Sequence, residues 1–198
     1  MSELLKVIIL SIVEGITEYI PISSTAHLIL VEDMLKLGMA QKETFEISIQ
    51  LGAILSVIWL YKPVFIPLFS PKNWLSKQSK IILAAIMPVM ILGYIAYPYI
   101  KLLFSPKIVA ISLLLGGIVM IIVEKIIRPK ATTKAIEDIT YRQAMIIGFC
   151  QCFALWPGTS RSGSTIVGGL LAKLDHDTAA KFSFIIAVPV MIARSEEH

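Results

Sequence analysis

Two long apolar runs place the strongest constraint on how this chain folds. Residues 81–97 (IILAAIMPVMILGYIAY) and 108–123 (IVAISLLLGGIVMIIV) contain no charged side chain. Each run approaches the ~20 residues that an α-helix needs to cross about 30 Å of hydrocarbon. Residues 47–61 and 179–193 are shorter candidates of the same kind. The sequence therefore predicts an all-α, polytopic membrane protein.

The overall composition excludes an ordinary soluble domain. Of the 198 residues, 56% are hydrophobic and 16% are charged, and the mean hydropathy is +0.79. Soluble domains contain about 45–50% apolar and about 25% charged residues. The apolar content also excludes intrinsic disorder. Cys150 and Cys152 lie one residue apart, which excludes a disulfide scaffold and fits no zinc or redox spacing.

The basic residues lie in the connections between apolar runs. The net charge is +4 and the pI is about 9.0, but these short basic stretches resemble cytoplasmic loops, so no nucleic-acid partner is expected. Residues 62–80 and 124–142 hold half of the Lys and Arg residues. The positive-inside rule places these two connections inside, and 31–44 and 98–107 outside. The Gly116–Gly117 pair predicts a close helix contact.

Two stretches, 4–30 and 143–172, are apolar at both ends but polar in the middle. A proline, several hydroxyls and charges at membrane depth are costly unless they are buried in protein or line a wet cavity, so each stretch predicts a broken or re-entrant helix pair. Superposing Pro21 on Pro157 aligns the hydroxyl pairs that follow them. Internal repeats with broken helices meet near the bilayer midplane, which would bring the two polar segments together.

Glu14 and Glu18 are the acidic residues of the first polar segment. They lie four residues apart, on one face of a helix. A carboxylate at membrane depth costs about 2.5–3.5 kcal/mol on insertion scales, so the pair requires a partner. The functional interpretation is a site for a divalent cation or a proton; the alternative is a shallow segment in which both carboxylates are solvated.

Hydroxyl groups and a histidine follow this pair. Ser23, Ser24 and Thr25 come after Pro21 and precede a helical run, so they would form an anion site at a helix N-terminus, or simply cap the helix. His27 lies close enough to act there as acid, base or nucleophile. Its alternative is a purely structural role.

The second polar segment, Pro157–Thr165, contains five hydroxyl side chains, flanking glycines and Arg161. Hydroxyls and backbone N–H groups bind phosphate oxygens, and a guanidinium binds them in bidentate fashion. The spacing is not that of a Walker A loop. In the alternative interpretation, Arg161 extends to the membrane interface. The nearby Asp175-His176-Asp177 triplet is interpreted as a solvated turn in which Asp177 caps the next helix, not as a metal site.

Two motifs carry a resemblance to a known family. EGITEYIPISSTAHLIL (14–30) and PGTSRSGSTI (157–166) resemble the two signatures of the undecaprenyl-diphosphate phosphatase family, also called bacitracin-resistance proteins. The similarity runs from about residue 4 to residue 193. It implies a multi-pass enzyme of the bacterial inner membrane, with inverted repeats and two re-entrant helix pairs.

The resemblance also implies an activity. The family hydrolyses undecaprenyl diphosphate to undecaprenyl phosphate, which recycles the lipid carrier of peptidoglycan synthesis and gives bacitracin resistance. It requires a divalent cation, Mg²⁺ or Ca²⁺, and its site opens to the outer face. The expected partners are a polyprenyl diphosphate and membrane lipids, with a homodimer left open. A lipid-phosphate flippase and a non-catalytic membrane scaffold are the alternatives.

The family's functional residues carry over onto matching positions of this sequence. Glu14 and Glu18 match its acidic pair and would bind the metal. The first polar loop matches Ser23, Ser24, Thr25 and His27; Ser24, His27 or a water is the expected nucleophile. The second loop, which holds the phosphate, matches Ser160, Arg161, Ser162 and Thr165.

Three further expectations depend on this resemblance. The chain forms one membrane domain, with a first repeat over about 1–123 and a partial second repeat over about 141–193. The family continues past its AVP segment with further helices, whereas five polar residues follow Ala193 here, which implies a truncated or frameshifted form. Ala26 replaces a usual glycine and is expected to tighten the backbone before His27.

Overall fold

The computed structural model of this chain describes residues 2–35, 42–68, 70–103, 105–127 and 130–195. The described part is helical and contains no strand. Its α-helices are α1 (Glu3–Thr17), α2 (Ser24–Leu35), α3 (Lys42–Leu60), α4 (Lys62–Leu68), α5 (Lys77–Ile100), α6 (Pro106–Ile121), α7 (Tyr141–Gln151), α8 (Arg161–Leu171) and α9 (His176–Ser195). The prediction of an all-α membrane protein is confirmed.

Three helical segments of the described chain are long and apolar enough to cross a membrane: Lys77–Ala96, Lys107–Ile126 and His176–Ala193. They confirm three of the four predicted spans, 81–97, 108–123 and 179–193. The fourth is α3, which passes the same test only together with α4, from which it is bent by 94°. The predicted connection over 62–80 contains α4, whose Phe65 is buried against the core.

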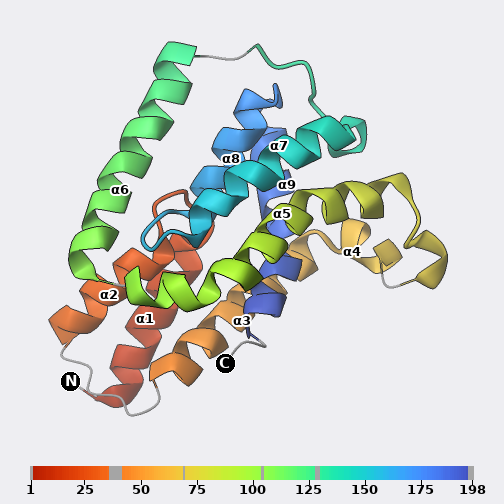
Figure 1. Cartoon of the computed structure of the whole chain (residues 1–198). Coiled ribbons are helices and arrows are strands. Elements are labelled where there is room, and N and C mark those ends of the chain that lie inside the picture. The colour runs from red at the N-terminus through yellow and green to blue at the C-terminus, as the bar shows by residue number, and fades with distance from the viewer. Residues whose placement is uncertain (1, 36–41, 69, 104, 128–129, 196–198) are drawn as a thin grey trace.

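Both polar segments form pairs of packed helices, as predicted. In the first, α1 packs against α2 and the turn Glu18–Ser23 joins them. In the second, α7 continues as a 3₁₀ turn (Cys152–Leu155) and packs against α8. Figure 1 shows the two turns beside each other near the middle of the molecule. The Ser162 hydroxyl donates to the Ile20 carbonyl across them at 3.3 Å.

Helix α9 forms the centre of the core. It packs against α3, α5 and α8, and Phe182, Ile185 and Ile186 are fully buried there. Helix α7 packs closely on α5, because Gly148 lies against the Ala85 carbonyl; a Cβ at Gly148 would come within 2.5 Å of that oxygen. The core therefore holds the second helix pair firmly.

Helix α6 stands apart from this core (Figure 1). Only 17% of its apolar window is buried. A Cβ at Gly116 or Gly117 would meet nothing within 4 Å, so the predicted close helix contact there is wrong. Its first turn makes one close backbone contact, where Gly158 (φ +85°) approaches Val109; a Cβ at Gly158 would lie 2.7 Å from the Val109 Cα. The last turn widens into a π-helix, Ile122–Ile127.

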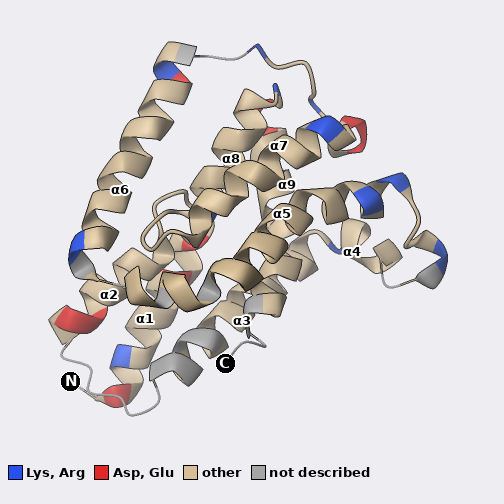
Figure 2. Cartoon of the chain, viewed as in Figure 1, with Lys and Arg blue, Asp and Glu red and all other residues tan. Residues whose placement is uncertain are grey.

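The basic connections lie at one end of the helices. Figure 2 shows Lys and Arg gathered at the ends of α5 and α7 and along the connection after α6. The Lys77 ammonium donates to the Glu137 carbonyl at 2.9 Å, which joins the 62–80 and 124–142 segments. They share one side, as the charge pattern predicts. Of the predicted opposite connection 31–44, residues 36–41 lie outside the described chain.

Candidate active site

An ion pair between the two polar turns defines the centre of the site. The Arg161 Nη2 atom lies 2.7 Å from the Glu18 Oε1 atom, and their side chains are 14% and 11% exposed. The two residues are 143 positions apart in the chain. Arg161 begins α8 and Glu18 follows α1, so the pair forms only when both helix pairs meet. The alternative in which Arg161 extends to the interface is wrong.

The same carboxylate also binds Ser24. The Ser24 hydroxyl donates to Glu18 Oε2, and Ser24 itself is buried at the first residue of α2. Glu18 therefore joins a guanidinium to a hydroxyl. Glu14, one turn earlier on α1, is fully buried. The alternative in which both carboxylates are solvated is wrong.

The backbone of Ser23 orients His27. Ser23 has φ +63°, a left-handed conformation that L-residues seldom adopt and that marks local strain. Its carbonyl lies 2.9 Å from the His27 Nδ1 atom. A carbonyl only accepts, so Nδ1 donates, and in the neutral ring Nε2 remains unprotonated. His27 is thus fixed with a basic nitrogen available.

The backbone at Ala26 differs from the strained backbone at Ser23. Among the described non-glycine residues, only Ser23 and Lys173 have positive φ. Ala26 lies inside α2, is 1% exposed and has an ordinary helical backbone that needs no glycine. The expected tightening before His27 stays a prediction.

The N-terminus of α8 faces the first turn. Ser160 caps it, accepting from the Gly163 N–H at 3.1 Å, and its hydroxyl lies 3.1 Å from that of Ser162. Helix α2 begins in the same region at Ser24, beside the partly buried Thr25. Two helix N-termini and a guanidinium provide a positive environment for an anion between the turns.

Ser183 of α9 supports Arg161, and the sequence analysis did not single it out. Its carbonyl accepts from Arg161 Nη1 at 3.3 Å. Its hydroxyl lies 2.5 Å from the Thr165 Oγ1 atom, which is 3.0 Å from the Arg161 carbonyl. Thr165 is buried and contacts both Arg161 and Ser183. In the sequence, the only indication that Ser183 has a polar partner is that its hydroxyl lies within an apolar run.

Tyr19 anchors the first turn. Its hydroxyl donates to the Ala53 carbonyl of α3, and its ring packs edge-on against Phe184 of α9, with centroids 5.3 Å apart and planes at 78°. Ser183 and Phe184 are consecutive, so one segment of α9 contacts both turns. This arrangement fixes Glu18 and Arg161 relative to each other.

The Asp175-His176-Asp177 triplet lies at the beginning of α9. No group of three His, Cys, Asp or Glu side chains among the described residues could hold a metal. Asp175 caps α9 by accepting from the Thr178 N–H at 2.8 Å, which corrects the prediction that Asp177 does so; Asp177 instead pairs with Lys181 at 2.5 Å. Cys150 and Cys152 are free thiols.

These features define an integral membrane protein with a buried ionic centre between two helix turns. A sequence profile described as "Bacitracin resistance protein BacA" matches residues 7–196. The chain therefore belongs to this family, and the resemblance seen in the two motifs is confirmed.

Relatives with curated names agree. Undecaprenyl-diphosphatase 1 of Bacillus cereus is 46% identical over 197 residues, which is 97% of this chain and 74% of that protein. Undecaprenyl-diphosphatase of Clostridium tetani is 47% identical over 204 residues, covering 98% and 74%. Undecaprenyl-diphosphatase of Methanococcus aeolicus is 46% identical over 195 residues, with the same coverage.

Proposed function

We propose that this protein hydrolyses undecaprenyl diphosphate to undecaprenyl phosphate and inorganic phosphate. The observation that carries the proposal is the buried ion pair between Arg161 and Glu18, with the Ser24 hydroxyl on the same carboxylate. The guanidinium and the two helix N-termini can bind phosphate oxygens, and the hydroxyl beside them can attack phosphorus. The names of the relatives support this enzyme and lend no support to a flippase or a scaffold.

Arg161 and the start of α8 bind the diphosphate in this mechanism. Phosphoryl transfer depends mostly on positioning and on stabilising charge that spreads over the phosphoryl oxygens. The guanidinium and the N–H groups behind Ser160 are fixed before substrate arrives, because Ser183 and Thr165 hold Arg161 from behind. Preorganised donors of this kind require little rearrangement at the moment of reaction.

Ser24 is the proposed nucleophile. Its oxygen attacks the terminal phosphorus while its proton passes to Glu18, and the bond to the bridging oxygen breaks, which releases undecaprenyl phosphate. A water, deprotonated by the Nε2 atom of His27, then hydrolyses the phosphoserine and releases phosphate. The alternatives are direct attack by water and a phosphohistidine at His27.

A divalent cation, Mg²⁺ or Ca²⁺, fits the donors present only together with substrate. Glu14 and Glu18 supply carboxylates, and Mg²⁺ commonly binds one or two carboxylates plus substrate phosphates rather than a complete protein cage. Glu14 is fully buried on α1, one turn before Glu18. When bound, the cation would offset negative charge on the diphosphate.

We place the protein in the bacterial inner membrane, with this centre facing the outer side. The basic connections at one end support that orientation through the positive-inside rule. The product is the lipid carrier of peptidoglycan synthesis, so the reaction would recycle it and oppose bacitracin. A homodimer stays a prediction.

Phosphate release by the purified protein in detergent tests the proposal. We expect release from undecaprenyl diphosphate with Mg²⁺ or Ca²⁺, and loss of release with EDTA. Mass spectrometry of the protein after rapid denaturation at mildly alkaline pH, where both phosphoserine and phosphohistidine survive, should find phosphate on Ser24; phosphate on His27, or on neither residue, would select an alternative nucleophile. Lipid translocation between leaflets without hydrolysis would contradict the proposed enzyme.

A further inference from the structure

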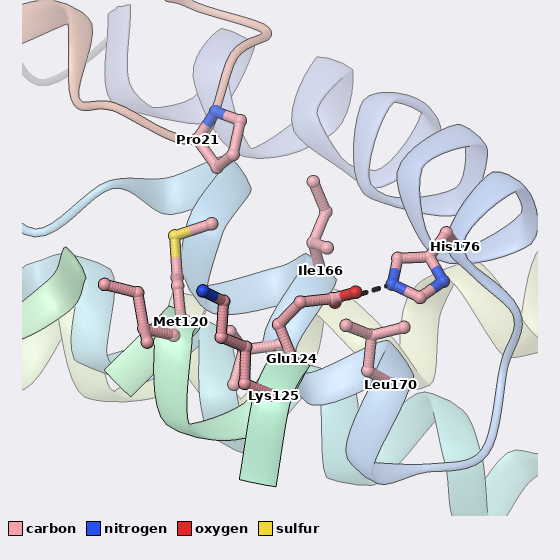
Figure 3. Close-up of a pocket in the computed structure, with 9 residues that line it drawn as sticks. Pro21, Met120, Glu124, Lys125, Ile166, Leu170 and His176 are labelled. Carbon is pink, nitrogen blue, oxygen red and sulfur yellow. Dashed lines mark hydrogen bonds and ion pairs between the residues drawn. The ribbon is translucent and has the colours of Figure 1, made fainter. Parts of the chain in front are cut away.

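A cavity of about 370 Å³ lies beside the ionic centre, between α6 and α8 (Figure 3). This volume is within the range of roughly 300–1,000 Å³ that ligand pockets occupy. The lining is almost entirely apolar and includes Pro21, Met120, Ile121, Ile166, Val167 and Leu170. The mechanism proposed above makes no use of this cavity.

The charged groups of the cavity lie on its rim. Glu124 and Lys125 come from the π-helix, and His176 begins α9. The His176 Nε2 atom lies 2.7 Å from the Glu124 Oε2 atom, and their side chains are 69% and 56% exposed. Figure 3 shows this pair on the opposite side of the cavity from Pro21. The Glu124–His176 pair therefore lies away from the end that is next to the ionic centre.

The cavity lies next to the ionic centre along the chain and along α8. The Ile20 carbonyl accepts a hydrogen bond from Ser162, and the next residue, Pro21, lines the cavity. Ser162, Ile166 and Leu170 follow one another at intervals of four, which places them on one face of α8. The helix that presents its N-terminus to an anion thus becomes a wall of the cavity.

We propose that this cavity binds the isoprenoid units next to the diphosphate of the substrate. The inference rests on the proposed function, because it takes the ionic centre as the diphosphate site. A prenyl chain has no polar group, so it requires the kind of wall that Ile166 and Leu170 provide. Glu124 and Lys125 of the π-helix at the end of α6 line this cavity, and such turns occur often at functional sites.

Chain-length kinetics test this assignment. We compare farnesyl diphosphate, with three isoprene units, and isopentenyl diphosphate, with one. In Ile166→Phe the added ring fills the cavity, so KM for farnesyl diphosphate should rise about tenfold while kcat stays within about twofold. Hydrolysis of isopentenyl diphosphate should change far less, because its single unit occupies less of the cavity, and retained hydrolysis also shows that the variant folds. The matched control is Leu171→Phe, on the same helix and 41% exposed, which should leave both substrates unaffected.

An equal loss with both substrates, or an unchanged KM for farnesyl diphosphate, would overturn the assignment. A second measurement, photo-cross-linking, does not depend on turnover. Its probe is a farnesyl methylenediphosphonate, which is not hydrolysed, with a diazirine on its second isoprene unit. We expect its cross-links at Met120, Ile166 or Leu170, and a strong decrease in Arg161→Gln. Displacement by phosphatidylglycerol but not by farnesyl diphosphate would identify a membrane lipid as occupant and overturn the proposal.

The labelling also separates the two proposals. Labels that depend on Arg161 but fall outside the cavity, for example at the exposed Leu114, overturn the cavity assignment alone. Cavity labels that are equal in the wild type and in Arg161→Gln place the headgroup elsewhere and overturn the proposed diphosphate site.

Discussion

At the residue scale, the proposed chemistry depends on how Glu18 is shared between Arg161 and Ser24. A lysine at 161 keeps the charge but loses the fork that reaches Glu18, Ser183 and the phosphate together. We expect Arg161→Lys to lower kcat/KM for undecaprenyl diphosphate about 10²–10³-fold, the usual loss for one preorganised donor. Phosphate-release kinetics measure this, with the exposed Arg142→Lys as control; normal turnover in Arg161→Lys would contradict the phosphate-binding role.

The strained backbone of Ser23 makes a second prediction at this scale. Its φ of +63° costs an L-residue about 1–2 kcal/mol relative to glycine. The variant Ser23→Gly should therefore be more stable than Ser23→Ala by about 1 kcal/mol. Unfolding in detergent by denaturant measures the difference. If the alanine variant proves the more stable of the two, the turn is not strained at this position.

The sequence identified most residues of the centre but not their connections. Glu14, Glu18 and Arg161 stand out because a charge within an apolar run is costly. That Arg161 pairs with Glu18 could not be predicted, because it depends on how two distant turns meet. Ser183 gave a weaker signal, since a hydroxyl in a membrane helix commonly bonds within its own helix, as Ser112 does to Ile108.

At the element scale, close helix contacts follow from backbone geometry that sequence does not reveal. Gly148 and Gly117 look alike in the sequence, yet only Gly148 lies against another backbone. We expect Gly148→Ala to destabilise the protein by about 1–3 kcal/mol, since α7 must move away from Ala85. Gly117→Ala, the matched control, should be neutral or stabilising by up to about 1 kcal/mol. Equal effects in detergent unfolding would contradict the packing of α5 on α7.

The boundaries of short helices also depend on tertiary contacts that the sequence does not reveal. The apolar runs predict the long helices because hydrophobic length alone determines a span. Helix α4 could not be predicted that way, because it is short and its burial depends on the tertiary contact of Phe65. The cap of α9 was also misplaced, since both Asp175 and Asp177 are suitable capping residues and only the geometry chooses Asp175.

The cap at Asp175 predicts a pH dependence of stability. Hydrogen bonds from Thr178 lower the pKa of Asp175 below its usual value. A lowered pKa in the folded state means that the stabilisation is complete above the unfolded value of about 3.9 and is lost as the pH falls through the folded value. Asp175→Ala should therefore lower Tm at pH 7, and the difference from wild type should shrink below about pH 4. A difference that grows on acidification would exclude this cap; Asp177→Ala serves as control.

At the scale of the whole molecule, the proposed function requires two helix pairs that meet at their turns. Neither turn alone contains both members of the ion pair. The carboxylate of Glu18 belongs to the first turn and the guanidinium of Arg161 to the second. Helix α9 connects them through Ser183 and Phe184. The ionic centre lies between the basic end of the helices and the opposite end. The side of the membrane from which substrate reaches it therefore depends on which end faces the cell interior.

That orientation can be measured in a background with Cys150→Ser and Cys152→Ser, which removes the free thiols. Lys134→Cys lies in the basic connection, and Lys107→Cys lies at the opposite end of α6. Because basic connections stay inside, a membrane-impermeant maleimide should label Lys107→Cys in intact cells and Lys134→Cys only after permeabilisation. The reverse pattern would place the basic end outside, and the ionic centre would then be supplied with substrate from the inner leaflet.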